Sequence, residues 1–474
     1  MQMISLIFFG FTAIVYLLMY FVNRISNDKK SNNITNWILL AASYLFVAYA
    51  DWRFIIVLII LTVSTWFFAY CKKTSLGIIV ALAMLFFFKY TNFFVSSFSK
   101  VFGDDVVVLN IILPIGLSFY TFSAISYLVD VKRKKIEIKE LKDVALYLSF
   151  FPKITSGPIQ KSEDFFEQMN HKREIGWHTF SVGIQIFLFG LFKKIVLADR
   201  LGVFVNQVYR TPLAFGSLTV FMAAVAYSFQ IYFDFSGYSD MAIGVAEILG
   251  FKLPRNFNLP YLAHNVTELW KRWHITLSLW LQEYLYISLG GNRKGKVRTY
   301  FNLIMTMVLG GLWHGANWTY VIWGLLHGIA LVGHKVWMTL MGTSTKKHSL
   351  LSNTVSVACT FLFTTFCWIF FRADSLSHAL SIIRKIFSFE TGLEQPYMWL
   401  FISIIVLAIC SMAALIKSKK QNIKILKMNI SFVEGYYPIV DLTKFWGVVL
   451  FFVFCGLILG LAYTGGSPFI YGNY

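Results

Sequence analysis

Charged residues are scarce in this sequence, and their scarcity excludes whole classes of protein. Asp, Glu, Lys and Arg make up 14% of the 474 residues, whereas 57% are hydrophobic; an ordinary soluble domain is about 25% charged. A water-soluble protein of this length could not cover its surface, and disorder requires the opposite balance. Apolar stretches recur from residue 3 to residue 463, and no Lys or Arg precedes the first of them. We therefore predict an all-α, polytopic membrane protein whose first span is not cleaved and whose N-terminus lies outside.

Cysteine pairs and several catalytic signatures are also missing. The five cysteines form no CxxC pair, which argues against a disulfide framework and a thiolate zinc site. The sequence contains no GxxxxGK[ST] of an ATPase, no GxSxG of a serine hydrolase and no HExxH of a zinc protease. We predict neither a bound metal nor a bound cofactor.

Apolar segments that approach the roughly 20 residues needed to cross a bilayer are abundant, and we expect between eleven and thirteen spans. The predicted spans are 3–22, 36–50, 54–70, 76–98, 106–129, 180–197, 217–233, 299–313, 316–341, 351–371, 397–416 and 445–463. The net charge of +19 gathers in short loops, and every second loop is basic, which orients helices rather than indicating nucleic-acid binding. Lys193 and Lys194 interrupt this alternation, so the topology of 144–200 stays open, with a re-entrant segment at 150–152 as an alternative.

The chain is expected to form one integral-membrane domain. It comprises N-terminal helices (1–105), a catalytic core (about 106–341) and C-terminal helices (350–474). The stretch 252–298 contains no run long enough to span, and its amphipathic part predicts a helix at the interface or dipping into the bundle.

The segment LGGLWHGANWTYVIWGLLHG (309–328) is the first candidate site. His314 lies between two apolar spans, where a titratable group is a functional hypothesis by default. Gly310, Gly311 and Gly315 leave room for a helix break and for close approach of a substrate. A buried neutral imidazole can accept a proton from a hydroxyl, although a histidine merely hydrogen-bonded at a helix junction is the alternative.

The segment TELWKRWHITLSLW (267–280) is the second candidate. It places His274 among Trp270, Trp273 and Trp280, beside Lys271 and Arg272. Aromatic and basic residues together are common interfacial anchors. Arg272 would equally suit a phosphate on a nucleotide-bearing acyl carrier.

Two carboxylates interrupt the apolar segment IYFDFSGYSDMAIG (231–244). Asp234 and Asp240 do not share a helical face, and Ser236-Gly237 predicts a break that would let them converge. Intramembrane carboxylates usually face the bundle interior or a water cavity, where these would position a His or Arg or relay protons. His327 and His334 lie two turns apart on one face, and we interpret them as polar packing residues.

Six blocks in order make the sequence resemble the membrane-bound O-acyltransferase family, in particular its bacterial alginate O-acetylation type. They are LPIGLSFYTFSAISYLVDV (113–131), YLSFFPKITSGPI (147–159), FDFSGYSDMAIG (233–244), LGFKLPRNFNLPY (249–261), WKRWHITLSLWLQEYLYISLGGNRKG (270–295) and the WHG block at 309–328. The resemblance implies helices around a central funnel or tunnel. It also implies that His314 is the key histidine and that His274 is a second polar position, often Asn in eukaryotic members.

The resemblance further implies that an acetyl group passes from cytoplasmic acetyl-CoA, at the bacterial cytoplasmic membrane, to an exported polysaccharide, commonly with an extracytoplasmic SGNH-type transferase as partner. His314 would act as base; His274, Trp313 and Asn317 are candidate oxyanion donors; Lys271 and Arg272 would suit the CoA phosphates. A covalent acyl-histidine relay stays open, as does the polymer: alginate, cellulose, another exopolysaccharide or peptidoglycan. Three competing hypotheses are D-alanyl transfer to teichoic acid, a glycan transporter or flippase with Asp234 and Asp240 as proton-coupling groups, and a non-catalytic scaffold.

Overall fold

The computed structural model describes the chain in segments that divide into two compact units. The described residues are 3–25, 28–102, 109–342, 349–417, 422–425, 428–433, 437–466 and 469–470. Unit 1 comprises Met1–Ile184 and Met241–Pro254, and unit 2 comprises Gln185–Asp240 and Arg255–Asn473.

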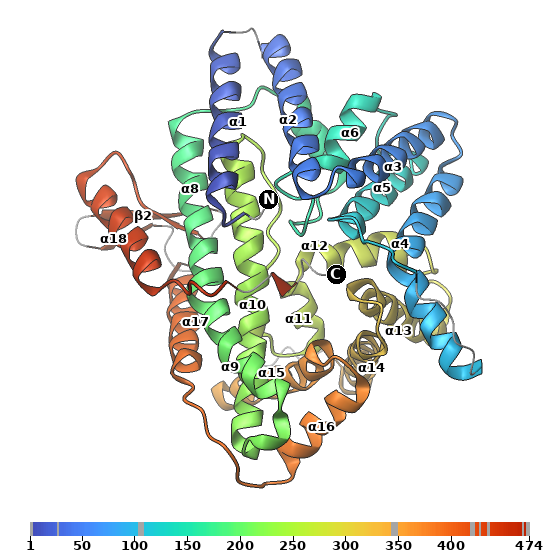
Figure 1. Cartoon of the computed structure of the whole chain (residues 1–474), viewed down its shortest axis with the longest axis vertical. Coiled ribbons are helices and arrows are strands. Elements are labelled where there is room, and N and C mark those ends of the chain that lie inside the picture. The colour runs from blue at the N-terminus through green and yellow to red at the C-terminus, as the bar shows by residue number, and fades with distance from the viewer. Residues whose placement is uncertain are drawn as a thin grey trace. The chain divides into compact units, whose positions relative to one another are not determined.

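Unit 1 is built from apolar helices. Its helices are α1 (Leu6–Ile25), α2 (Asp28–Ala50), α3 (Arg53–Tyr70), α4 (Thr74–Phe102), α5 (Leu117–Lys132), α6 (Leu141–Ser149) and α7 (Ser162–Asn170), followed by the start of α8 (Trp177–Leu191). In Figure 1, α1 and α2 form an antiparallel pair, and α3, α4 and α5 pack together.

The segment after α6 is buried without being a span. Phe150 and Phe151 are completely inaccessible. The Phe150 ring packs against Phe165 of α7, at 5.4 Å between centroids, and against Phe251, at 4.8 Å. This aromatic packing holds a nine-residue helix and its following turns inside unit 1.

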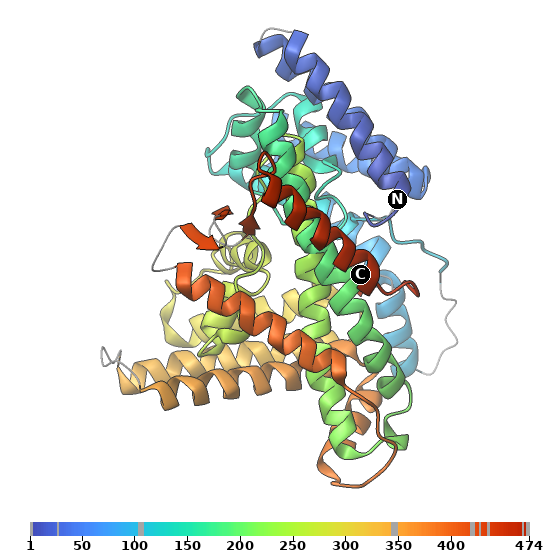
Figure 2. The same ribbon diagram turned by 90° about the vertical axis from the view of Figure 1, so that its left-hand side faces the viewer.

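Unit 2 contains the remaining helices and a small sheet. After α8 come a π-helical turn (Phe192–Ala198), α9 (Asp199–Arg210), most of α10 (Ser217–Ile248), α11 (Val266–Arg272), α12 (Ile275–Trp280), a second π-helical turn (Leu281–Tyr286), α13 (Gly295–His314), α14 (Trp318–Met341), α15 (Leu350–Arg372), α16 (Leu376–Phe387), α17 (Met398–Lys417) and α18 (Phe445–Leu461); single 3₁₀ turns cover Pro212–Ala214 and Pro260–Leu262. Helices α13 and α14 lie side by side, as Figures 1 and 2 show.

Every predicted span contains a helix, and the prediction of an all-α polytopic membrane protein is confirmed. Eight of the described helical segments have the length and apolar composition needed to cross a bilayer, and the described parts of α17 and α18 are shorter. The two largest errors in the predicted boundaries concern the fifth and seventh spans. The helix expected at 106–129 begins only at Leu117, because Pro114 precedes it and Gly116 adopts φ 75°. The span expected at 217–233 continues to Ile248.

Short strands follow α17, in the stretch between the predicted spans 397–416 and 445–463. β1 (Asn422–Ile425), β2 (Met428–Val433) and β3 (Tyr437–Ile439) form an antiparallel sheet in that order. Asn422 pairs with Ser431, which pairs in turn with Ile439. The sheet matters for the site because its third strand contains Tyr437, whose side chain is buried in unit 2.

Candidate active site

His314 is the last residue of α13, at a tight connection to α14. Gly315 is extended and ends the helix, and the side chain of Asn317 caps α14 by accepting a hydrogen bond from the Thr319 N–H at 3.1 Å. The Asn317 amide nitrogen also donates to the Asp374 carbonyl at 3.0 Å. The amide oxygen therefore caps the helix, and the amide nitrogen, which the sequence suggested as a possible oxyanion donor, already donates a hydrogen bond to Asp374.

Gly315 provides the predicted helix break after His314, whereas Gly311 and the facing Gly324 serve close packing of α13 against α14. A Cβ atom on Gly311 would lie 2.2 Å from the carbonyl oxygen of Tyr320, and one on Gly324 would lie 2.3 Å from the carbonyl oxygen of Met307. Real side-chain atoms do not approach backbone so closely, so α13 and α14 touch at these two residues because neither has a side chain. The expected room for a substrate beside Gly311 is thus occupied by α14.

The imidazole of His314 lies in an aromatic enclosure. Only 2% of the residue is exposed. Its ring centroid is 5.0 Å from that of Trp313, 5.2 Å from Trp323 and 5.3 Å from Phe371. The structure also brings His274, forty residues earlier, to 6.4 Å between ring centroids. The two histidines that the sequence singled out are therefore neighbours.

His274 lies at a break between α11 and α12, so the expected single amphipathic helix is two short ones. The backbone of His274 is left-handed, with φ 42°. The ring of Phe235 on α10 packs nearly perpendicular to the imidazole, at 4.6 Å between centroids. The side chain is completely buried, and this burial lowers its pKa from about 6.5 to about 3.

Asn256 fixes the tautomer of His274. The Asn256 Oδ1 atom accepts hydrogen bonds from the backbone N–H of Thr276 at 3.3 Å and from its hydroxyl at 3.0 Å, which identifies it as the oxygen. It lies 3.0 Å from His274 Nδ1, so this ring nitrogen must be the donor. In neutral His274 the proton is then on Nδ1, and Nε2 carries the lone pair. Neutral His274 presents an acceptor at Nε2, not the N–H that an oxyanion would require.

The tryptophans and basic residues of 270–273 occupy different environments. Trp273 is buried, with its ring 4.9 Å from that of Trp368 and 5.1 Å from that of Phe257. Trp270 packs edge-on against His327, at 5.2 Å between centroids. Arg272 is bound to Glu268 at 2.7 Å, one helical turn earlier.

Lys271 is exposed to solvent, in contrast to the buried ring of Trp273 nearby. The interfacial-anchor interpretation fails for Trp273, because its ring is enclosed by other aromatic side chains.

Asp234 and Asp240 belong to a buried ion-pair network, and the expected break between them does not occur. Helix α10 runs through both without interruption. Asp240 lies 2.5 Å from Lys193, and Asp234 lies 2.6 Å from Lys194, which also contacts Asp199 at 2.8 Å. All five side chains are nearly inaccessible to solvent.

Two further contacts join this network to the C-terminal part of the chain. The hydroxyl of Tyr437 on β3 donates to Asp240 at 2.8 Å, and the backbone N–H of Ile470 donates to Asp234 at 2.8 Å. In the sequence, Lys193 and Lys194 were inconsistent with the predicted alternation of basic loops. They are instead the cations that neutralise these carboxylates, and nothing in their position requires a loop.

His327 and His334 both contact α11 from α14. His334 Nδ1 lies 2.8 Å from the Thr267 hydroxyl, and His327 is buried between Trp270 and Trp323. Within the described ranges, no group of three or more His, Cys, Asp or Glu side chains is arranged to hold a metal ion.

Several known proteins are similar to this chain. A sequence profile of the MBOAT, membrane-bound O-acyltransferase, family matches residues 45–377. The probable alginate O-acetylase AlgI of Pseudomonas putida is 36% identical over 472 residues, covering 92% of this chain and 94% of the relative. The peptidoglycan O-acetyltransferase of Helicobacter pylori is 38% identical over 336 residues, covering 65% and 63%. The teichoic acid D-alanyltransferase of Streptococcus thermophilus is 30% identical over 245 residues, covering 49% and 59%.

Proposed function

Because this chain belongs to the membrane-bound O-acyltransferase family, we propose that it moves an acetyl group from acetyl-CoA to a hydroxyl of an exported polysaccharide. That it is a membrane acyltransferase follows from the family and from its relatives. The acetyl group and the polymer are supported by the names of the relatives that cover most of the chain, one acting on alginate and one on peptidoglycan. D-alanyl transfer has weaker support, since that relative matches only half of the chain.

The observation that carries the proposal is the meeting of His314 and His274 beside Trp313. These three side chains are buried in unit 2, and their rings lie within 6.4 Å of one another between centroids. Enclosure of this kind keeps water from a thioester and strengthens electrostatic interactions with the reacting atoms.

In the proposed reaction His314 is the general base. It takes the proton of the acceptor hydroxyl as that oxygen attacks the thioester carbonyl, a form of help worth roughly 10²–10⁴ in rate. The resulting oxyanion collapses, the carbon–sulfur bond breaks, and the CoA thiolate takes the proton back from the imidazolium. The products are the acetyl ester and CoA.

His274 and Trp313 take different parts in this proposal. The indole N–H of Trp313 can only donate, so it suits the developing oxyanion. His274 presents the lone pair of Nε2 and so suits an incoming hydroxyl, which it would orient. Arg272, already paired with Glu268, would meet a CoA phosphate only by exchanging partners, and the exposed Lys271 is the simpler candidate.

We further propose that the protein resides in the bacterial cytoplasmic membrane and hands the acetyl group to an extracytoplasmic SGNH-type transferase or directly to the polymer. A relay through an acetylated histidine would differ from direct transfer by a covalent intermediate that survives removal of the acceptor. Trapping with labelled acetyl-CoA and mass spectrometry of the 309–328 peptide would distinguish the two routes.

The deciding experiment measures ester-linked acetate released by mild alkali from purified envelope polysaccharides. It compares the parent strain, a deletion, and the deletion complemented with His314→Ala at matched membrane abundance. The control is His334→Ala, a histidine of the adjacent helix that hydrogen-bonds Thr267. Loss of acetate from one polymer with His314→Ala, and retention with His334→Ala, would support the proposal and identify the polymer.

Other results would favour the competing hypotheses. Full acetylation by His314→Ala would leave a scaffold as the better account. Unchanged acetate with a defect in polymer export would favour a transporter, and loss of D-alanine from teichoic acid would favour the D-alanyl transferase.

A further inference from the structure

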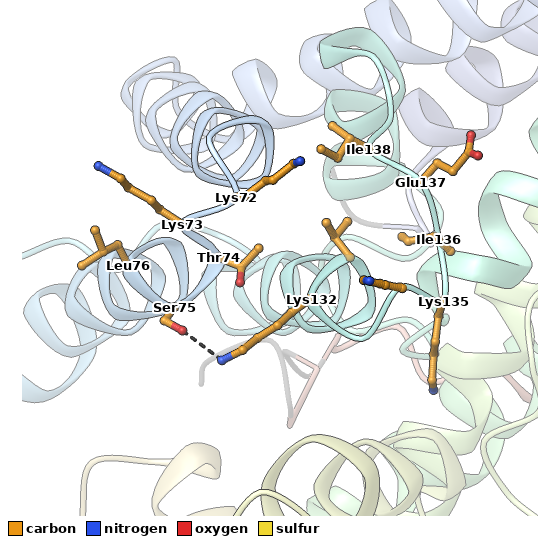
Figure 3. Close-up of a pocket in the computed structure, with 12 residues that line it drawn as sticks. Lys72, Lys73, Thr74, Ser75, Leu76, Lys132, Lys135, Ile136, Glu137 and Ile138 are labelled. Atoms are coloured by element: carbon orange, nitrogen blue, oxygen red, sulfur yellow. Dashed lines mark hydrogen bonds between the residues drawn. The ribbon is translucent and has the colours of Figure 1, made fainter.

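A broad basic groove opens in unit 1, apart from the residues considered so far. Its volume is about 860 Å³, and it lies between the α3–α4 turn and the segment that follows α5. Figure 3 shows residues 72–76 on one side and the extended segment 135–138 on the other, with Lys132 between them. Five lysines line it: Lys72, Lys73, Lys132, Lys134 and Lys135.

Two of these lysines occupy backbone positions that favour glycine. Lys72 has φ 57° and Lys134 has φ 59°. Each is the second residue after the last helical residue, of α3 and of α5 respectively. The N–H of Lys72 bonds the carbonyl of Ala69, and the N–H of Lys134 bonds that of Val131, both at 3.0 Å.

The next residue completes the same cap at each site. The N–H of Lys73 bonds the carbonyl of Phe68 at 2.8 Å, and the N–H of Lys135 bonds that of Asp130 at 2.9 Å. This is the Schellman arrangement, whose left-handed residue is usually Gly because a side chain there is strained. In this protein lysine takes the place of glycine at both caps, and both lysines line the same groove. We therefore attribute the choice of lysine at these positions to its charge rather than to the cap.

The rest of the lining distinguishes between possible anions. Among the residues that line the groove, all of them described, Glu137 is the one carboxylate and no aromatic ring is present to stack on a base. Leu76, Val131 and Ile136 supply apolar surface beside the lysines. The groove also begins where α3, a helix able to span a membrane, comes to its end. Charge next to apolar surface at a helix end fits a lipid better than a nucleotide.

We propose that this groove binds the headgroup of an anionic phospholipid. Basic pockets between the ends of transmembrane helices suit such headgroups, and each lysine near the surface contributes attraction that salt weakens. The flexible side chains of Lys72 and Lys134 would reach the phosphate, and the neighbouring apolar residues would contact the upper part of the acyl chains. The lipid would tie the α3–α4 turn to the segment after α5.

The test uses the full chain purified in a neutral detergent and titrated with dioctanoyl phosphatidylglycerol, with binding followed by native mass spectrometry. The variant Lys72→Gly/Lys134→Gly removes two groove charges and relieves the strained backbone, so it should unfold at no lower temperature than the wild type. The control, Lys294→Gln/Lys296→Gln, removes two exposed charges from unit 2.

The groove variant should lose affinity about tenfold or more at low salt, whereas the control should stay within about twofold and dioctanoyl phosphatidylcholine should not compete. Equal loss in groove variant and control, or no loss in the groove variant, would overturn the proposal. Displacement of the lipid by adenosine 3′,5′-bisphosphate at equal concentration would also overturn it, because the groove would then be a nucleotide site. Inorganic phosphate competing as well as the lipid would show that the acyl chains are not recognised and would refute the lipid assignment.

Discussion

The Lys193–Asp240 pair offers the sharpest test of the buried ion-pair network. Lys193→Met keeps an unbranched side chain of most of the original length and removes its charge. Asp240 then stays buried, with the Tyr437 hydroxyl at 2.8 Å but without the cation at 2.5 Å. Removing one partner of a buried pair costs about 3–5 kcal/mol, which is a large share of the 5–15 kcal/mol that typically separates native from unfolded protein.

The double variant Lys193→Met/Asp240→Asn should recover most of this loss, because it removes both charges and leaves an amide that still accepts from Tyr437. The assay is the fraction of monodisperse protein after a temperature series, measured by fluorescence-detected size-exclusion chromatography, with Lys294→Met as the exposed control. If Lys193→Met matches that control, or if the double variant is no more stable than the single one, the pair is not held as a buried ion pair and the reasoning fails.

Three further predictions follow from the site. Gly311→Val should separate α13 from α14, since its side chain would meet the Tyr320 carbonyl oxygen, where a Cβ would already lie at 2.2 Å; melting temperature and turnover should both fall, and normal values for both would contradict the close packing. Asn256→Leu should reduce turnover up to about 10²-fold by releasing His274, whereas Asn256→Asp, which keeps the acceptor, should retain most of it. Because burial lowers the pKa of His274 to about 3, the unfolded chain binds the proton first as pH falls below about 6.5, so stability should be full above that pH and about 2 kcal/mol lower at pH 5; thermal melts of His274→Asn should show a correspondingly smaller loss between pH 7.5 and 5.

The membrane character and the helix positions were predictable because they depend on local composition. An apolar run must satisfy its backbone internally in lipid, so it becomes a helix wherever its neighbours lie. The ends were less predictable. Helix α10 continues through residues 234–248, beyond its predicted end, even though this stretch contains Asp234 and Asp240. The helix tolerates these carboxylates because Lys193 and Lys194, from an earlier part of the chain, neutralise them.

Those partners were visible in the sequence without being recognised. Lys193 and Lys194 stand in an apolar segment, and two carboxylates stand in the next one. Treating all four charges as buried from the start would have paired them and removed the topological inconsistency.

The approach of His274 to His314 was predictable only through the family resemblance. Forty residues and a π-helical turn separate them, and no spacing rule joins them. The role of Asn256 could not be predicted, because the amide contacts Nδ1 only after the loop at 251–259 has folded beside α12. Which nitrogen of His274 faces the site is therefore a tertiary property.

The left-handed backbone at position 274 also constrains how this site can change by mutation. At φ 42° most side chains are strained, and the residues that tolerate the region best are Gly, Asn, Asp and His. A single nucleotide substitution converts a histidine codon to one for asparagine or aspartate. Drift at this position therefore leads most easily to residues that keep the chain path and exchange a titratable ring for an amide or a carboxylate, so the side-chain chemistry can change here while the path of the chain does not.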